Sequence, residues 1–372
     1  MSDDLDRLAE ELEQLRTEAP RGISRLEPWL RTVAERQASD LLLVAGEAPA
    51  LRIHGRVVRG DITPLDGVEI EDMVLPELPP HAQRAYRDQG IADASRKVPG
   101  IGRFRINLHR ERGRAAANIR MLPSKVPALA SLDLPPGADA LPRLPRGLVL
   151  IGGATGSGKT TTLAAIVDDI NRREAKHIIT IEDPIEYEHA NHKSIIQQVE
   201  IGVDAPDFPT ALRSALRQGP DVIVIGEMRD PETMRIALAA GETGHLVLST
   251  LHTTDVPSTL ARMTDSFPSE RQPTIRQEIA AALTAVFVQT LLPRQAGGRI
   301  PAAELLVVSY GARQHIRRNA LQHLHQEITI TKKLGSFSLE ESLARLVKAG
   351  LVERSEAALR ANHPEDFEHA LG

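Results

Sequence analysis

Short apolar runs recur through the second half of this chain. They lie at residues 148–151, 178–181, 222–225, 246–248 and 286–292. Segments compatible with helices separate the earlier runs. Strands buried on both faces appear as nearly continuous apolar runs, and strands that alternate with helices build parallel sheets. The pattern therefore predicts an α/β domain with a mainly parallel sheet and helices on both of its faces.

The first third of the chain has a different pattern, in which apolar and polar residues alternate over short stretches. It predicts a helix over residues 24–37 and a strand over residues 39–44. Hairpins are expected at residues 51–58 and 102–122, and two short helices between residues 64 and 88. This order of elements predicts a small α+β domain ahead of the larger α/β domain.

The segment between the two domains holds six prolines and little periodicity, which is typical of a linker. Leucines spaced three and four apart near the N-terminus allow either a short coiled-coil seam or a surface helix. The predicted division is an N-terminal helical extension (1–22), an α+β domain (23–122), a linker (123–147), an α/β core (148–292) and a C-terminal helical region (293–372).

Composition narrows the classes of protein that the chain can be. Hydrophobic residues make up 41% and charged residues 26%, which favours a folded globular protein. The acidic start excludes a secretory signal, so we expect a cytoplasmic protein. With no Cys, disulfides and cysteine zinc sites are excluded. A net charge of −5 with 3% aromatics argues against a general nucleic-acid surface.

Candidate chemistry begins directly after the first apolar run. The segment fits the phosphate-loop pattern G-x-x-x-x-G-K-[ST] with Gly153, Ala154, Thr155, Gly156, Ser157, Gly158, Lys159 and Thr160, and Thr161 follows. Glycines let successive N–H groups converge on phosphate oxygens at a helix start. Lys159 should reach the β- and γ-phosphates, and the Thr160 hydroxyl should bind Mg²⁺. The sequence therefore predicts a nucleotide site.

Polar residues follow the next three apolar runs. Glu182, Asp183 and Glu186 come after the second, Glu227 after the third, and His252 after the fourth. The carboxyl ends of parallel strands share one edge, so these residues should lie near the phosphate loop. Glu227 can hold Mg²⁺ or orient the attacking water, and Glu182, Asp183 and Glu186 can share that work. Helix capping remains the structural alternative for each carboxylate.

The motifs at these positions resemble a known family. IEDPIEYEH, LRQGPDVIVIGEMRD and TGHLVLSTLHT are similar to the Asp box, Walker B region and His box of the secretion ATPases of type II secretion and type IV pili. The resemblance covers residues 30–350 and is strongest to the pilus retraction ATPases. It implies a RecA-like P-loop ATPase core, a PAS-like first domain and metal ligands Thr160, Glu227 and Asp183. Residues 311–317 keep three positions of the family's tail motif.

The resemblance also implies an assembly and partners. Family members act as homohexamers in which arginines of the first domain complete the site, here Arg105 and Arg120. It implies an ATP- and Mg²⁺-dependent motor for pilus retraction, peripheral at the inner-membrane base of the pilus beside a platform protein. A paralogous retraction ATPase is a further possible partner, and no stable nucleic-acid complex is expected. The alternatives are an accessory paralogue that depends on a partner motor, an assembly or type II secretion ATPase, and a nucleic-acid translocase.

Overall fold

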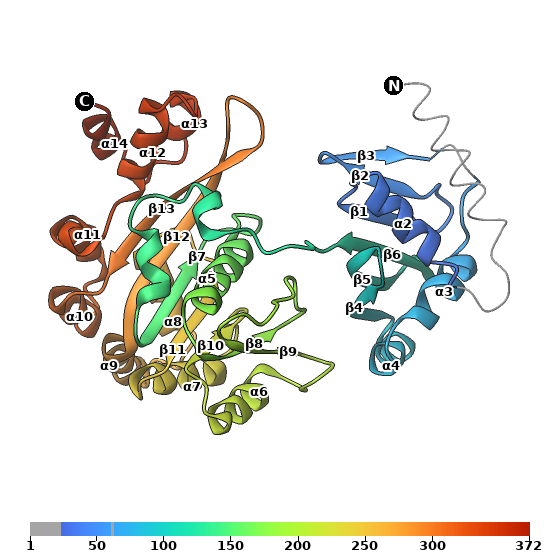
Figure 1. Cartoon of the computed structure of the whole chain (residues 1–372), viewed down its shortest axis with the longest axis horizontal. Helices are drawn as coiled ribbons and strands as arrows, with labels where there is room; N and C mark the ends of the chain where they lie inside the picture. Colours follow the sequence, from blue (N-terminus) through green and yellow to red (C-terminus); the bar gives the residue numbers. More distant parts are fainter. Residues whose placement is uncertain (1–23, 61–62) are drawn as a thin grey trace. The chain divides into compact units, whose positions relative to one another are not determined.

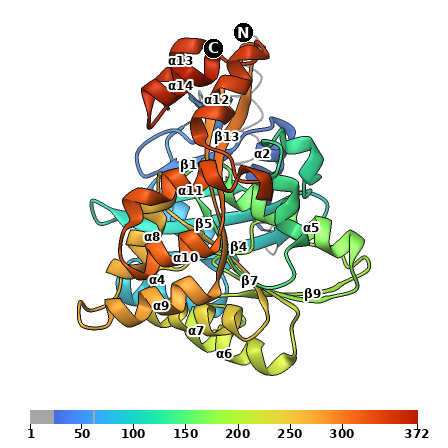
Figure 2. The same cartoon turned by 90° about the vertical axis from the view of Figure 1, so that its left-hand side faces the viewer.

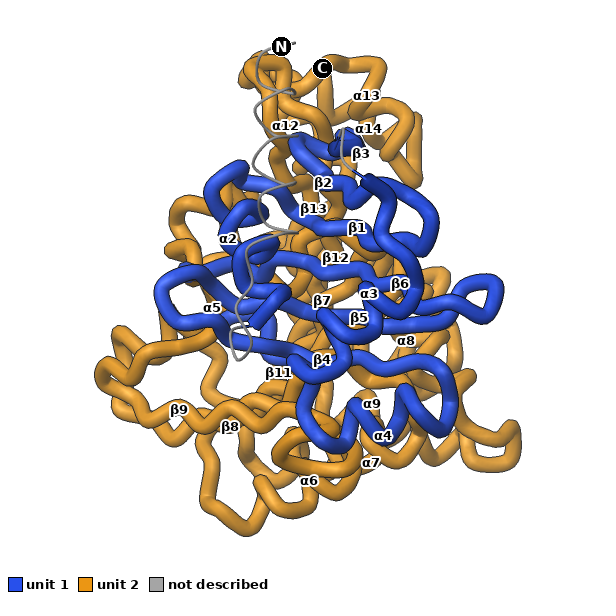
Figure 3. The backbone as a smooth tube through the Cα atoms, turned by 90° about the vertical axis from the view of Figure 1, so that its right-hand side faces the viewer, with its two compact units in different colours: residues 1–125, 184–187 blue, residues 126–183, 188–372 orange. Residues whose placement is uncertain are grey.

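The computed structural model describes residues 24–60 and 63–372, which form two compact units. One unit comprises the described residues up to 125 with residues 184–187, and the other comprises residues 126–183 and 188–372 (Figure 3). The predicted leucine-rich extension at residues 1–22 lies outside the described residues. In the described part of the chain, every helix is too short or too polar to cross a bilayer.

The smaller unit is an antiparallel sheet covered by helices (Figure 1). Its order is β3-β2-β1-β6-β5-β4, with strands β1 (Asp40–Val44), β2 (Ala50–Ile53), β3 (Arg56–Arg59), β4 (Ile91–Val98), β5 (Gly102–Glu111) and β6 (Arg114–Met121). The helices are α2 (Glu27–Glu35), α3 (Gly67–Val74) and α4 (Pro80–Gln89). Phe104, Ile106 and Leu108 alternate into its core. The predicted hairpin turn is confirmed, because Arg112 and Gly113 both have positive φ.

The larger unit contains a sheet of seven strands in the order β13-β12-β7-β11-β10-β8-β9. Six of the seven strands run parallel, and the seventh, β13, pairs antiparallel with β12. The strands are β7 (Gly147–Gly152), β8 (His177–Glu182), β9 (Ile195–Glu200), β10 (Val222–Ile225), β11 (Leu246–Leu251), β12 (Leu283–Pro293) and β13 (Arg299–Val307). The predicted mainly parallel α/β sheet is confirmed.

Helices cover both faces of this sheet because alternate side chains of its strands point to opposite sides. Leu148 and Leu150 join one core, and Val149 and Ile151 join the other. The first core includes residues of the helices α6 (Phe208–Ala215), α7 (Pro231–Glu242), α8 (Val256–Asp265) and α9 (Gln272–Ala282). The second core is covered by α5 (Lys159–Arg173). The central strand β7 is therefore buried on both faces.

Two segments differ from the sequence-based expectation. The proline-rich stretch expected to be a linker contains the 3-10 helices η2 (Leu129–Leu132) and η3 (Ala138–Arg143). Ala138 and Leu141 of η3 are buried in the second core, so this part of the stretch is folded. The sheet also extends beyond residue 292, because β13 lies in the region expected to be helical. The exact domain boundaries stay a prediction.

The C-terminal part after β13 is helical, as expected. Its helices are α10 (Tyr310–Arg317), α11 (Leu324–Ile330), α12 (Leu339–Lys348), α13 (Arg354–Ala358) and α14 (Pro364–Leu371). Helices α10 and α11 pack against α9 and α8 (Figure 2). Ser338 and Glu341 form the expected capping box at the start of α12. Helices α12 to α14 share a separate apolar cluster with the ends of β12 and β13.

Candidate active site

The phosphate loop joins the buried strand β7 to the N-terminus of α5. Gly153 has φ of 148°, and a Cβ there would lie 2.3 Å from Ser157 Oγ and 2.6 Å from the Gln289 carbonyl oxygen. Gly158 has φ of 90° and is the N-cap residue of α5. Side chains are excluded at these turns by both space and backbone conformation. The loop thus presents backbone N–H groups at a helix start, an arrangement that binds phosphate.

Lys159 lies inside this loop rather than in solvent. Its residue surface is 7% exposed, and Nζ donates hydrogen bonds to the carbonyl oxygens of Gly153 at 2.8 Å and Ala154 at 3.0 Å. The same ammonium lies 3.4 Å from His252 Nδ1. Since an ammonium only donates, Nδ1 of this ring accepts, and Nε2 carries the proton of the neutral ring. His252 is thereby brought into contact with the loop.

Glu227 lies close to His252, because the two residues follow the neighbouring parallel strands β10 and β11. Its Oε2 lies 3.6 Å from His252 Nε2, and its other carboxylate oxygen pairs with the Arg229 guanidinium. A cavity of about 270 Å³ opens here, lined by Glu227, Met228, Arg229, Thr250, Leu251, His252 and Arg262. The three predicted residues Lys159, Glu227 and His252 therefore form one connected polar chain beside a cavity.

The ionisation of His252 follows from its surroundings. Burial is the largest effect and lowers the pKa of the imidazole below its ordinary 6.5, and the Lys159 charge lowers it further. Glu227 acts in the opposite direction without reversing the shift. His252 is therefore neutral at pH 7, with a proton on Nε2 that faces the Glu227 carboxylate.

The acidic residues after β8 lie at the same edge of the sheet, because β8 pairs in parallel with β10. Glu182 Oε1 accepts hydrogen bonds from Thr180 Oγ1 at 2.7 Å and Gln198 Nε2 at 3.1 Å. These two donors orient the carboxylate. The negative charge of Asp183 acts on Arg229, the same guanidinium that pairs with Glu227. The Asp box and the Walker B segment thus share an electrostatic environment.

Gln289 supports the phosphate loop and was missed by the sequence analysis. It lies on β12, is 3% exposed, and donates from Nε2 to the Ser157 carbonyl oxygen at 2.6 Å. The signal was a single amide within the apolar run 286–292. Among the described residues, Ser157 Oγ is buried without a hydrogen-bond partner, as is Gln289 Oε1. The hydroxyl is thus an orphaned polar group at the place where a phosphate would bind.

The donors beside the loop fit Mg²⁺, which takes oxygen ligands. Thr160 lies half-buried in the first turn of α5, and Glu227 and Asp183 contribute carboxylates from neighbouring strand ends. All three side chains offer oxygen. Their assignment as metal ligands stays a prediction, as do the catalytic roles of Glu182, Glu227 and His252.

Arg105 and Arg120 belong to the smaller unit, where they form part of a charge row that crosses its sheet. They lie directly opposite each other on β5 and β6, and Arg120 lies opposite Asp40 on β1. Asp93 Oδ1 is 3.6 Å from Arg105, and Asp40 Oδ1 is 2.7 Å from Arg120. Arg52 binds the other oxygen of Asp40 at 3.2 Å. The charge row therefore pairs each arginine with an acidic side chain, while their part in the nucleotide site stays a prediction.

Comparison with known proteins points to one family. The family model for the type II/IV secretion system protein matches residues 138–334. The type IV pilus retraction ATPase PilT of Pseudomonas aeruginosa is 40% identical over 334 residues, covering 90% of this chain and 97% of the relative. The type IV pilus ATPase PilU of the same organism is 35% identical over 342 residues, covering 92% of this chain and 90% of the relative.

The solved structures agree with this result. The crystal structure of the pilus retraction motor PilT with bound ADP superposes with a TM-score of 0.82 and 38% identity, covering 91% of this chain and 98% of that one. Because it covers 91% of this chain, the similarity spans both units. The chain therefore belongs to the type II/IV secretion system family of P-loop ATPases, among the retraction ATPases of type IV pili.

Proposed function

We propose that this protein is an ATP-hydrolysing motor that withdraws pilin subunits from type IV pili, and that it works as a homohexamer with bound Mg²⁺. The observation that carries the proposal is the connected chain of Lys159, His252 and Glu227 at the phosphate loop. A retraction ATPase related over nearly the whole chain supports the direction of work.

The residues of this chain suggest a division of labour during hydrolysis. Lys159 would exchange the Gly153 and Ala154 carbonyl oxygens for phosphate oxygens of ATP. Glu227 would orient the attacking water, and neutral His252 would donate from Nε2 towards the same carboxylate. Mg²⁺, when bound by oxygen donors such as Thr160, supplies countercharge to the β- and γ-phosphates.

Coupling to movement would depend on the arginines of the smaller unit. We propose that Arg105 and Arg120 approach the γ-phosphate in only some states of the ring, so that nucleotide state and domain angle are linked. Support comes from the charge row, which holds both guanidiniums on the same strand pair. The proposed partner is a pilus platform protein, and the proposed place is the cytoplasmic face of the inner membrane.

An accessory role is the second candidate, favoured by the similarity to PilU. Multiple-turnover ATP hydrolysis by the purified chain alone distinguishes an independent motor from an accessory protein. An accessory ring that depends on a partner motor would hydrolyse little ATP by itself. Addition of single-stranded DNA or RNA should leave the rate unchanged. A clear stimulation would instead support a nucleic-acid translocase.

Whether the motor retracts or assembles pili is tested in cells rather than with the purified protein. A strain that lacks this protein should keep or accumulate surface pili and fail to shorten them. Pilus counts by electron microscopy, with the same gene restored as control, give the answer. Bald cells would show that the ring builds the fibre and would contradict retraction.

A further inference from the structure

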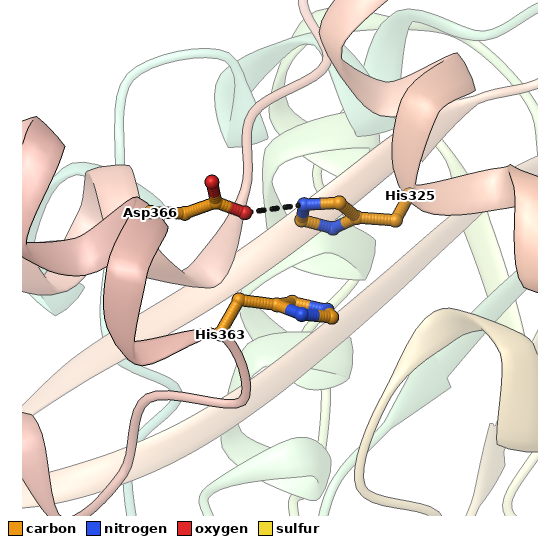
Figure 4. Close-up of side chains that lie close together, drawn as sticks. All are labelled: His325, His363 and Asp366. Atoms are coloured by element: carbon orange, nitrogen blue, oxygen red, sulfur yellow. Dashed lines mark hydrogen bonds and ion pairs between the residues drawn. The ribbon is translucent and has the colours of Figure 1, made fainter.

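A second cluster of chemically active side chains lies in the C-terminal helical part. His325, His363 and Asp366 face one another (Figure 4), and their ligand atoms all lie within 4.8 Å of one another. His325 Nε2 lies 3.0 Å from Asp366 Oδ2. The two imidazole rings are 4.1 Å apart between centroids and tilted by 38°. Two imidazoles and a carboxylate thus converge on one point at the surface.

Each of the three residues is held by a neighbour that the fold fixes. His325 lies on α11 directly after Leu324, which is fully buried. His363 precedes α14, and its backbone N–H donates to the buried Glu340 carboxylate at 3.0 Å. Asp366 precedes Phe367, which is 1% exposed. The backbone at each position is therefore anchored, while the side chains remain accessible from solvent.

We propose that His325, His363 and Asp366 bind a divalent transition-metal ion, with zinc as the best match. Zinc accepts imidazole nitrogen and carboxylate oxygen in tetrahedral sites, and sites with three protein ligands complete the fourth position with water. Ligand atoms in such a site are about 3.3 Å apart for bonds of about 2.0 Å. The present distances are within 4.8 Å, so binding would draw the ligand atoms closer together through side-chain rotation. Mg²⁺ and Ca²⁺ fit less well because they favour oxygen ligands.

The ion would join two parts of the larger unit. Leu324 of α11 belongs to the apolar core beneath the main sheet, and Phe367 of α14 belongs to the separate cluster formed by α12 to α14. Ligands from both helices would therefore fasten the C-terminal helices to the sheet. An ion that binds only the folded state stabilises that state, by an amount that grows with the logarithm of the free ion concentration relative to the dissociation constant. The site uses none of the nucleotide-binding residues.

The test is zinc binding to the full chain after treatment with EDTA and dialysis. Wild type should bind one zinc per chain, measured by competition with a chromogenic chelator, and zinc should raise its thermal unfolding temperature. His363→Ala and Asp366→Asn should each weaken zinc binding by at least about 10- to 100-fold. Mutation of a residue that only hydrogen-bonds a metal ligand already lowers metal affinity by that factor. His369→Ala is the matched control, because His369 is exposed on α14 outside the cluster. It should bind as wild type does.

Two results would overturn the proposal. Equal zinc affinity in wild type, His363→Ala and Asp366→Asn would show that the cluster is only a surface hydrogen bond beside a histidine contact. Binding that survives in these variants but disappears in His252→Ala would place the ion at the nucleotide site instead. Circular dichroism spectra that match the wild type would show that each variant is folded.

Discussion

The buried side chain of Glu304 should make the free energy of unfolding of the larger unit depend on pH. It lies on β13, is 5% exposed, and accepts a hydrogen bond at Oε1 from the Val256 backbone N–H at 2.6 Å. Burial is the main cause that raises the pKa of this carboxyl from 4.5 to about 8, and the Asp255 and Glu340 charges contribute to the rise. The Val256 hydrogen bond opposes the shift. The side chain is therefore mostly protonated at pH 7 in the folded protein.

This shift has a defined effect on stability. The folded-state pKa lies above the unfolded value, so the contribution to stability is complete below pH 4.5 and is lost as pH rises towards 8. The loss is about 1.4 kcal/mol per pH unit. From pH 4.5 to 7 it sums to about 3.5 kcal/mol. Glu304→Gln removes the ionisable group but keeps an oxygen that accepts from Val256.

We therefore expect the free energy of unfolding of Glu304→Gln, relative to wild type, to rise with pH between 5 and 8 by about 1.4 kcal/mol per unit. Urea unfolding followed by circular dichroism at several pH values measures it. The single tryptophan, Trp29, lies in the smaller unit, so its fluorescence reports that unit separately. Glu365→Gln, at an exposed position, is the control. Parallel stability curves for Glu304→Gln and wild type would refute the reasoning.

Further predictions concern the nucleotide site. Lys159→Ala should abolish tight ATP binding and turnover in nucleotide titrations, since a fixed countercharge is lost; unchanged affinity would contradict the site. Glu227→Gln should bind ATP yet hydrolyse it about 10²-fold or more slowly; a normal steady-state rate would exclude its role. Gln289→Leu should weaken nucleotide binding, because the loop loses a buried hydrogen bond; an unchanged dissociation constant would reject that support. Arg105→Ala and Arg120→Ala should each lower the hydrolysis rate more than the affinity, and wild-type turnover would make them surface residues only.

Much of the fold could be predicted because its central strands are buried on both faces. The runs at β7, β8, β10 and β11 are apolar throughout or nearly so, and the phosphate loop follows one of them directly. Strands β4, β9 and β13, which lie at sheet edges, were missed, whereas the edge strand β3 was predicted as part of a hairpin. β4 and β9 expose much of their surface, so polar residues interrupt their patterns. β13 is buried but contains Pro301 and Glu304, which break its apolar run.

The candidate site was predictable in its residues but not in its contacts. Sequence position placed Glu227 and His252 after strands, and parallel pairing brings those strand ends together. The hydrogen bond from Gln289 to the Ser157 carbonyl oxygen joins residues that are 132 positions apart in the sequence. No local sequence pattern encodes such a contact. The hydrogen bonds from Lys159 to loop carbonyl oxygens likewise follow from the folded shape of the loop.

The charge row on the smaller unit has a consequence for how that face meets an anion. Two positive side chains stand side by side at its centre, and an acidic side chain flanks each of them. The fields of such neighbouring opposite charges largely cancel, and physiological salt screens the remainder beyond about 8 Å, so attraction of an anion at long range is weak. Like charges directly opposite on neighbouring strands repel. An oxyanion that bridges Arg105 and Arg120 would relieve this repulsion while competing with Asp93 and Asp40, so the face would discriminate ligands by the spacing of their oxygens and not by net charge.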